Sequence, residues 1–402
     1  YRSDDEVSNF RIRPERRHEY ELGADISLFD GSMGISTTIY NAINNDVIYN
    51  VDVTPSTGAD EMTANGASIG NKGIEFTIDY RAIDTEKLKW DSKLIYASNK
   101  NSVLEMNGIT GSMAKLMSED LVPSRGIAKF SEVSPGREYA EFKVLSWARF
   151  GYGMVVDHDL NINTPDVNID TLKDYSWSKN DVYVAKNGLP IMYSQKIWSG
   201  FAPNPDWTGS FFNELSIGKK LKISCLIDIS IGGHIANYTK NALYEWGTHA
   251  DTDKRYHPDF DNPNWHGYQE GVSTNWGKGT FQELLNHNHK SIGPGQDTII
   301  TYSQNFYENY MGRNTDVINN IEDASYAKLR ELSLSYNFGK INNSYLGNPG
   351  VIVRLSAQDL ITWTKYSGWD PETNMYQDRI SGEDYFNQPQ TWRANLALQL
   401  NW

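Results

Sequence analysis

The sequence predicts an all-β protein whose antiparallel strands form a transmembrane β-barrel. Three observations carry this prediction: long runs alternate apolar and polar side chains, the connections alternate between short and long, and aromatic residues gather at strand ends. The closing stretch TWRANLALQLNW shows the alternation best, with one apolar face from Trp392 to Trp402 and one polar face from Arg393 to Asn401. Such a strand suits a soluble sheet or a sheet with lipid on one side and water on the other.

Long stretches of this kind recur along the whole chain. In the pair 18–29 and 33–43, Asp30 to Ser32 provides a tight turn that contains Gly31. Several runs reach 11 residues or more, which is enough for a tilted strand to cross a bilayer, where about 9–11 residues are needed. We expect nine long strands, at 18–29, 33–43, 71–80, 88–98, 206–217, 221–231, 328–338, 351–363 and 391–402.

The connections between these strands alternate strictly in length. We expect short turns at 30–32, 84–87, 218–220 and 339–350, and long loops at 50–66, 101–206, 240–321 and 365–390. An outer-membrane barrel has this asymmetry, with short periplasmic turns and long extracellular loops.

Aromatic residues mark the predicted strand ends. Membrane barrels carry aromatic girdles at both interfaces, although aromatic side chains also favour strands in general. The residues concerned are Trp207, Phe338, Trp363, Trp392 and Trp402.

Composition narrows the possible functions. The formal net charge of −14 over 402 residues argues against nucleic-acid binding, which needs a basic surface. The single cysteine, Cys225, excludes an internal disulfide. No run approaches 18 apolar residues, so the sequence predicts no transmembrane helix. We find no signal peptide, and the opening YRSDDEVSNF without an initiator Met is consistent with a mature or clipped product.

The long loops offer candidate binding residues. Residues 240–321 are rich in Trp, Tyr, His, Asp and Asn, which suit sugars or peptides because these ligands need stacking and directed hydrogen bonds. A loop of this size can equally use its aromatic residues to pack against itself. The candidates for contact with the ligand or with a covering partner are Trp246, Trp265, Tyr268 and Trp276.

Metal binding has weak support. Asp157, Asp159, Asn161 and Asn163 are spaced as in calcium loops, but the sixth position is not Gly and the twelfth, Asn168, is not acidic. A polar loop is the favoured interpretation, so we expect no cofactor, with calcium as the one candidate. Five histidines of one predicted loop lack the cysteines or fixed spacing of a zinc site and are read as surface residues. They are His249, His257, His266, His287 and His289.

The polar faces of the strands carry charges that could tune a channel. A water-filled lumen also simply tolerates charge, and for any single residue this is the safer interpretation. The residues expected to face the lumen are Glu75, Asp79, Lys93, Asp228, Glu331 and Arg354.

Several sequence phrases, and the order in which they follow one another along the chain, resemble the SusC-like TonB-dependent transporters. The resemblance runs from about residue 10 to Trp402, and the combination of KLRELSLSY with DLITWTKYSGWDPE is its most specific part. The other phrases are RPERRHEYELGADISLFDGSMGISTTIYNAINNDVI, GASIGNKGIEFTIDY and NPDWTGSFFNELSIGKKLKISCLIDISIGGHIAN.

The resemblance implies an outer-membrane barrel of about 22 strands with a plug in its lumen. Such transporters import glycans or peptides, with a SusD-like lipoprotein as lid and TonB supplying energy. Residues 1–402 would be the C-terminal portion, the last nine strands, without the plug and N-terminal domains. The remainder of the transporter would then be a necessary partner, because a nine-stranded sheet leaves two open edges in lipid.

The predicted function is therefore nutrient import across the outer membrane rather than catalysis. No G-x-x-x-x-G-K-[ST], H-E-x-x-H or G-x-S-x-G motif is present. The alternatives are a secreted soluble glycan-binding module, a β-sandwich or propeller hydrolase, which would need paired carboxylates in a cleft, and a receptor for siderophores or cobalamin.

Overall fold

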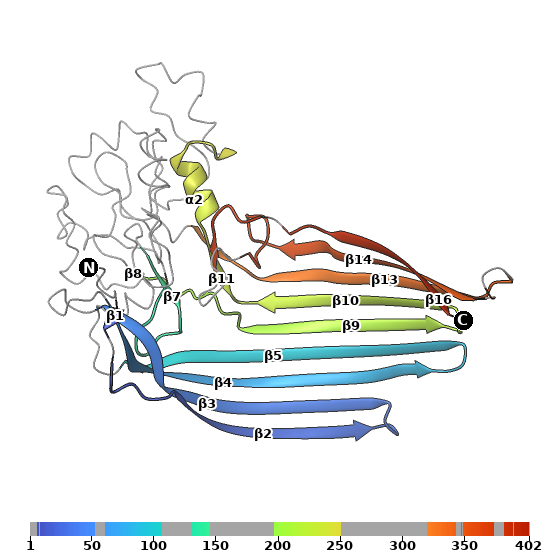
Figure 1. Ribbon diagram of the computed structural model, residues 1–402, viewed down its shortest axis with the longest axis horizontal. Coiled ribbons are helices and arrows are strands. Elements are labelled where there is room, and N and C mark those ends of the chain that lie inside the picture. The colour runs from blue at the N-terminus through green and yellow to red at the C-terminus, as the bar shows by residue number, and fades with distance from the viewer. Residues whose placement is uncertain are drawn as a thin grey trace, which may run out of the picture.

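One large antiparallel sheet dominates the structure, a computed structural model (Figure 1). The structure describes residues 6–7, 9–52, 61–106, 131–144, 197–250, 320–342, 347, 349–373, 382–388 and 390–401. Nine long strands pair in chain order, so each strand lies beside the one that precedes it and the one that follows it. They are β2 (Arg16–Leu28), β3 (Met33–Asp52), β4 (Glu61–Asp84), β5 (Leu88–Met106), β9 (Trp207–Ile217), β10 (Leu221–Ile231), β13 (Tyr326–Lys340), β14 (Gly350–Thr364) and β16 (Arg393–Asn401).

The two ends of this sheet differ. Tight turns close the hairpins β2–β3, β4–β5 and β9–β10 at one end, which we call the short-turn end; β13 ends, β14 begins and β16 finishes at the same end (Figure 1). Long connections leave from the opposite, long-connection end. The long connections predicted after β5, β10 and β14 are present, whereas the one between β3 and β4, residues 53–60, is no longer than the connection 341–349 at the short-turn end. Glycines with positive φ support two of the turns, Gly31 at 87° and Gly218 at 56°.

The strand register joins the apolar side chains into rows that cross the sheet. Leu22 (70% exposed), Leu396 (76%) and Leu398 (64%) show that the elements described in the structure leave this outward face uncovered. One row runs from β2 to β14 through Ile26, Ile35, Ile78, Leu94, Phe211, Ile227, Leu329 and Ile361. An apolar face of this extent needs an apolar neighbour, because exposing it to water is unfavourable.

The opposite, inward face is largely polar and charged. The register places on it all six charges predicted from the sequence, Glu75, Asp79, Lys93, Asp228, Glu331 and Arg354. Lys93 and Asp79 form an ion pair there at 3.1 Å. The role of these charges in tuning a channel stays a prediction.

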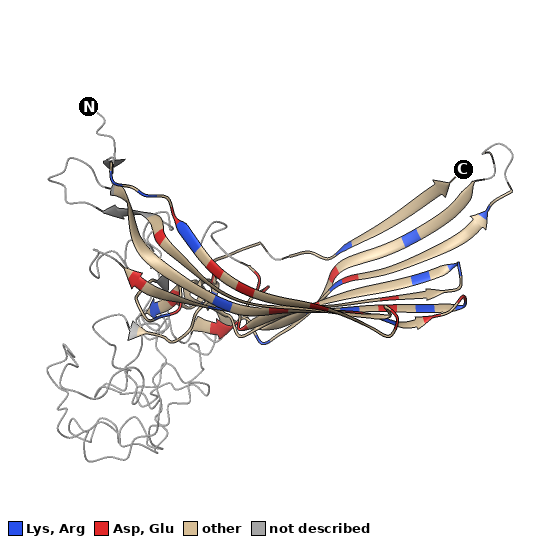
Figure 2. Cartoon of the chain, turned by 90° about the horizontal axis from the view of Figure 1, so that it is seen from below, with Lys and Arg blue, Asp and Glu red and all other residues tan. Residues whose placement is uncertain are grey.

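The sheet is curved rather than flat (Figure 2). Within the described part of the chain, β2 and β16 each pair with a single long strand, β3 and β14 respectively, so they form its two edges. A short strand, β1 (Glu6–Val7), pairs in parallel with the first two residues of β4, Glu61 and Met62.

Small elements decorate the long-connection end. β11 (His234–Asn237) pairs with β12 (Ile321–Asp323) and β15 (Glu383–Asp384), and α2 (Tyr238–Glu245) follows β11 directly. A second small sheet contains β6 (Ser131–Glu132), β7 (Glu141–Val144) and β8 (Ile197–Trp198). Phe142 and Val144 of β7 pack with Ala236, Tyr238 and Ile321 in a local core, so the fully buried side chains of the described residues gather at this end. In the part of the chain that the structure describes, no helix is long and apolar enough to span a membrane.

The predicted loop 50–66 is wrong in part. β3 continues to Asp52 and β4 begins at Glu61, and these two residues are register partners. The stretch is polar, but Ala64 and Ala67 are buried against Val103 and Val133. Small apolar residues among Thr, Asn and Gly hide this strand from a reading of hydrophobic alternation. β5 likewise extends to Met106, into the predicted loop 101–206.

The aromatic residues expected at strand ends are mostly described. Trp363 (52% exposed) and Trp392 (67%) lie toward the long-connection end, and Phe338 (57%) toward the short-turn end. Trp402 lies outside the described residues.

Candidate functional site

A β-bulge in β13 prepares the most elaborate polar site of the described chain. Ile227 pairs with Leu329 while Leu226 pairs with Glu331, so Arg330 is the extra residue. Strict alternation from Leu332 would point Lys328 and Arg330 outward among leucines. The bulge shifts the alternation by one residue, and both cations reach the inward face.

A network of two cations and four carboxylates surrounds this bulge. The Lys328 Nζ donates to both carboxylate oxygens of Asp370 at 2.7 Å and to Glu372 at 2.5 Å. Arg330 donates to Asp228 at 2.7 Å, to Asp359 at 3.1 Å and to Glu372. Lys328 is 1% exposed. The network therefore ties the segment after β14 to the ends of β10 and β13.

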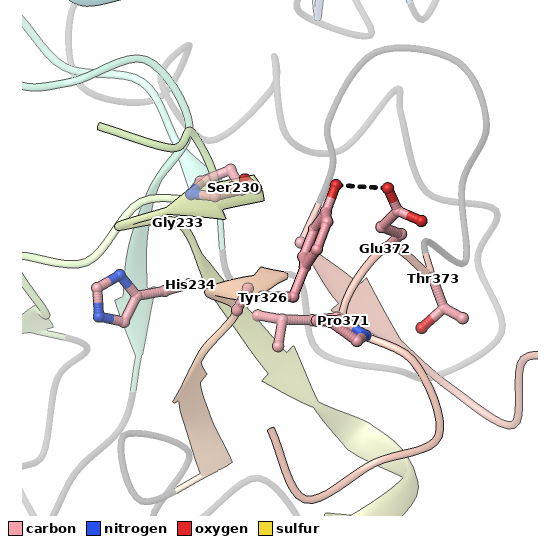
Figure 3. A pocket seen from close by; sticks show the side chains of 11 residues that line it. Ser230, Gly233, His234, Tyr326, Pro371, Glu372 and Thr373 are labelled. Atoms are coloured by element: carbon pink, nitrogen blue, oxygen red, sulfur yellow. Dashed lines mark hydrogen bonds between the residues drawn. The ribbon is translucent and has the colours of Figure 1, made fainter. Parts of the chain in front are cut away.

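Glu372 is held as an anion in this network. Burial opposes its charged form, but hydrogen bonds from Arg330, Lys328 and Tyr326 outweigh that effect and lower its pKa to about 2. Figure 3 shows the Tyr326 hydroxyl directed at the Glu372 carboxylate, with a hydrogen bond of 2.5 Å. Glu372 is thus a structural anion at neutral pH.

A second cluster anchors α2 to the same region. Glu322 of β12 accepts hydrogen bonds from the Ser367 backbone N–H at 2.7 Å and from the Lys240 Nζ at 3.0 Å. Burial opposes the charge of Glu322, yet Ser367 and Lys240 keep its pKa below its usual range. Nearby, the Tyr366 hydroxyl donates to Asp384 of β15 at 2.5 Å, and burial together with this carboxylate raises the pKa of Tyr366. α2, β12, β15 and the segment after β14 therefore form one platform.

The platform presents an exposed aromatic pair. Trp246 caps the C-terminus of α2 and is 57% exposed, and its ring stacks on Phe386 with centroids 5.3 Å apart and planes 10° apart. Phe386 has φ 50°, a left-handed conformation that is costly for a bulky residue, and its N–H donates to the Thr239 Oγ1 at 2.6 Å. The pair is thus held rigidly while 46% of Phe386 stays exposed.

A shallow pocket of about 220 Å³ lies beside the network. Tyr326, Glu372, Thr373, Pro203 and His234 contribute to its lining. The Tyr326 hydroxyl donates a hydrogen bond to the Glu372 carboxylate, so these two polar groups already bind each other (Figure 3). Ligand pockets usually measure about 300–1,000 Å³, so this one is small for a solute.

The His234 imidazole points away from Tyr326 and Glu372 in Figure 3 and packs on Phe201, with centroids 4.4 Å apart. Burial lowers its pKa, against the opposing charges of Asp323 and Asp206.

Most of the predicted contact residues lie outside the described residues. This applies to Trp265, Tyr268 and Trp276, to the calcium candidates Asp157, Asp159, Asn161 and Asn163, and to His257, His266, His287 and His289. Trp246 is described and is exposed at the platform. His249 stacks on Tyr244 with centroids 4.1 Å apart. Among the described residues, no group of three or more His, Cys, Asp or Glu side chains could hold a metal ion.

Sequence reasoning missed the network itself. Asp228 was expected on the inward face, but Lys328, Arg330, Asp370 and Glu372 were not singled out. One pattern could have revealed them, because Lys328 and Arg330 share the phase of Leu332 and Leu334 on a face predicted to meet lipid. Two charges there would be costly, so their presence indicates a bulge.

Comparisons with known proteins agree with this fold. TonB-dependent receptor P3 of Formosa agariphila is 23% identical over 98% of this chain, which spans 35% of the length of that relative. TonB-dependent receptor P39 of the same organism is 30% identical over 25% of the chain. No protein-family profile matches the sequence.

Among solved structures, the RagAB peptide transporter superposes with a TM-score of 0.56 at 17% identity, over 96% of this chain and 35% of that one. Its "open-open" state matches with the same TM-score. This likeness shows a shared barrel fold, and the predicted resemblance to TonB-dependent transporters is confirmed. A position in the C-terminal part of such a barrel is consistent with these matches.

Proposed function

The chain is homologous to TonB-dependent receptors, and on that basis we propose that it forms part of the wall of an outer-membrane barrel for active import of a large nutrient. The main support for this proposal is the continuous apolar face, with side chains such as Leu22 and Leu396 exposed on the side of the sheet opposite the charged face. Lipid on one side and a water-filled lumen on the other account for both faces.

We infer that residues 1–402 are the C-terminal portion of the transporter. The remaining strands would close the sheet at the β2 and β16 edges, and a plug would fill the lumen. The short-turn end would face the periplasm and the long-connection end the cell exterior, as in other outer-membrane barrels. Energy from TonB would reach this chain through the remainder of the protein.

The proposed solute is a peptide or an oligosaccharide, taken up together with a SusD-like surface lipoprotein. A solved transporter of the same fold is described as a peptide transporter, which supports the first choice. The rigid pair Trp246 and Phe386 supports a contact by stacking at the exterior end, because aromatic rings suit both solutes. This chain would act by binding and guiding the solute rather than by catalysis.

Lipid quenching tests the orientation of the wall. In the full-length transporter, with Cys225 replaced by Ser, a single fluorophore is attached at Leu396→Cys or at Asn395→Cys. We expect brominated phospholipids to quench the label at residue 396 strongly and the label at residue 395 weakly, because adjacent residues of a strand face opposite sides. Equal quenching, or no quenching at either position, would contradict the proposal and favour a secreted soluble glycan-binding module.

Uptake assays test the aromatic pair. Replacing Trp246 or Phe386 by Ala should raise the half-saturating solute concentration several-fold, since stacking contacts contribute about 0.5–1.5 kcal/mol. Trp369→Ala is the matched control, because Trp369 is 76% exposed at the same end and outside this stack. An equal effect of all three replacements would exclude a specific role of the pair.

A further inference from the structure

The outward apolar face stops abruptly on β2 to β5. Leu22, Ile39 and Ile74 are register partners in its last row, next to Ser98 of β5. The following row, two residues nearer the long-connection end, consists of Tyr20, Asn41, Lys72 and Lys100. The ladder is regular between these rows, so all four side chains keep the outward direction.

Lys72 and Lys100 are direct partners on adjacent strands. Directly opposite residues have Cβ atoms about 4.5–5.5 Å apart, and like charges in this arrangement are unfavourable. Both side chains are exposed. Elsewhere on this hairpin cations are neutralised, as Lys93 is by Asp79 and Lys89 by Asp84.

The surroundings of the pair offer little compensation. Within the described part of the chain, neither Lys72 nor Lys100 takes part in an ion pair. The charge of Lys100 acts on the half-buried Glu138, which accepts a hydrogen bond from Asn204 at 3.3 Å. The outward neighbours in the adjoining rows are uncharged apart from the titratable His18: Ile74, Ser98, Ile43, Gly70 and Ser102.

In the proposed barrel this row would lie at a membrane boundary. Tyr20, the residue that β2 contributes to this row, is 80% exposed. At the edge of the apolar rows, the Trp207 ring lies against the Tyr96 ring of β5, with centroids 5.5 Å apart. Such aromatic residues lie at the level of lipid headgroups. The two ammonium groups would then stand just beyond the acyl chains.

We propose that Lys72 and Lys100 together bind one phosphate group of an outer-leaflet lipid. This inference rests on the proposed function, since it requires lipid on the outward face and the long-connection end outside the cell. A phosphate between the two ammonium groups removes their repulsion and forms charge-assisted hydrogen bonds with both. The apolar rows below would hold the acyl chains of the same lipid, which distinguishes it from free phosphate.

The alternative is that each lysine extends independently to the interface, as lysines beside apolar surfaces often do. The two cases differ in additivity. Two cations that share one phosphate are coupled, whereas independent charges contribute additively.

Native mass spectrometry of the full-length transporter in detergent can measure this coupling. The probe is diphosphorylated lipid A, titrated against wild type, Lys72→Gln, Lys100→Gln and the double variant. We expect each single replacement to weaken binding about tenfold, as for the loss of one charge-assisted bond, and the double variant to lose only slightly more. The charge-matched control, Lys219→Gln with Lys220→Gln in the turn at the other end, should bind as wild type does.

Three outcomes would overturn the inference. The first is that each single variant loses as little lipid A affinity as the control variant does, and that these losses simply add in the double variant. The others are that phosphate-free lipid A binds as tightly as diphosphorylated lipid A, or that millimolar inorganic phosphate displaces lipid A. A gel assay of heat modifiability verifies that each variant assembles. If the label at residue 396 is quenched by brominated lipid but the lysines prove uncoupled, this inference alone fails. If that label is not quenched, the proposed function fails first.

Discussion

The two ends of the sheet are stabilised in different ways. At the short-turn end, Arg81 pairs with Asp91 at 2.8 Å and Lys89 with Asp84 at 2.9 Å, and all four side chains are 40–52% exposed. At the long-connection end, Lys328 and Asp370 pair at 2.7 Å with side chains 1% and 7% exposed.

The comparison teaches that location decides what an ion pair contributes. Exposed pairs add little because water and salt screen them, whereas a buried cation that loses its partners is strongly destabilising. The short-turn contacts also join residues close in sequence, 10 apart for Arg81 and Asp91, while Lys328 and Asp370 are 42 apart. The first end is locally encoded, and the second depends on the assembled sheet.

The largest expected effect comes from breaking the buried network. Lys328→Met should destabilise the barrel by about 3–5 kcal/mol, because Asp370 would remain buried without its cation and Glu372 would keep only Arg330. The temperature at which the folded band disappears in a heat-modifiability gel measures this loss. Lys89→Met at the short-turn end is the matched control and should scarcely change that temperature. Equal shifts for the two variants would remove the distinction between the ends.

A change in the wall between the two ends should have the next largest effect. Leu396→Asp places a charge on the outward face and should cost about 2 kcal/mol, which reduces the assembled fraction in the same gel. Asn395→Asp, one residue away on the inward face, should assemble normally. If both variants assemble equally well, the assignment of the faces is wrong.

The space available for a Cβ atom differs between two glycines of the β3–β4 pair, one toward each end of the sheet. Toward the long-connection end, a Cβ on Gly73 would lie 2.3 Å from the Ser98 carbonyl oxygen and 2.5 Å from the Tyr40 hydroxyl, so Gly73→Ala should cost about 1–2 kcal/mol. Near the short turns, a Cβ on Gly34 meets nothing within 4 Å, and Gly34→Ala should be neutral. Urea unfolding in detergent can rank the two variants, and a reversed ranking would contradict the packing described.

A last effect vanishes at neutral pH and is confined to acid. The pKa of Glu372 is lowered to about 2, so its contribution is complete above the ordinary pKa of about 4.5 and is lost as pH falls from there toward 2. Thermal unfolding between these pH values should show a decrease that Glu372→Gln reduces. A wild type whose unfolding temperature is constant across this range would exclude a charged Glu372 in the network.

Much of the sheet could be predicted because the alternation of apolar and polar residues within each strand identifies the two faces of that strand. The alternation in 221–231 and 391–402 placed Ile223 and Leu396 outward, and the register confirms it. The bulge at Arg330 could not be derived from alternation alone, since it depends on partners in β10, β14 and the segment after β14. The extension of β4 to Glu61 was hidden because its buried residues are alanines among polar neighbours.

By itself the sequence determined the nine strands, their two faces and the tight turns within three of the hairpins, because period-2 patterning and turn residues act over a few neighbouring positions. Only the tertiary structure decided which charges meet, as Lys328 meets Asp370, and which remain unpaired by the described chain, as Lys72 faces Lys100. The physical reason is that register and burial arise from pairing between distant segments, and electrostatic energies depend on the distances and the desolvation that this pairing creates.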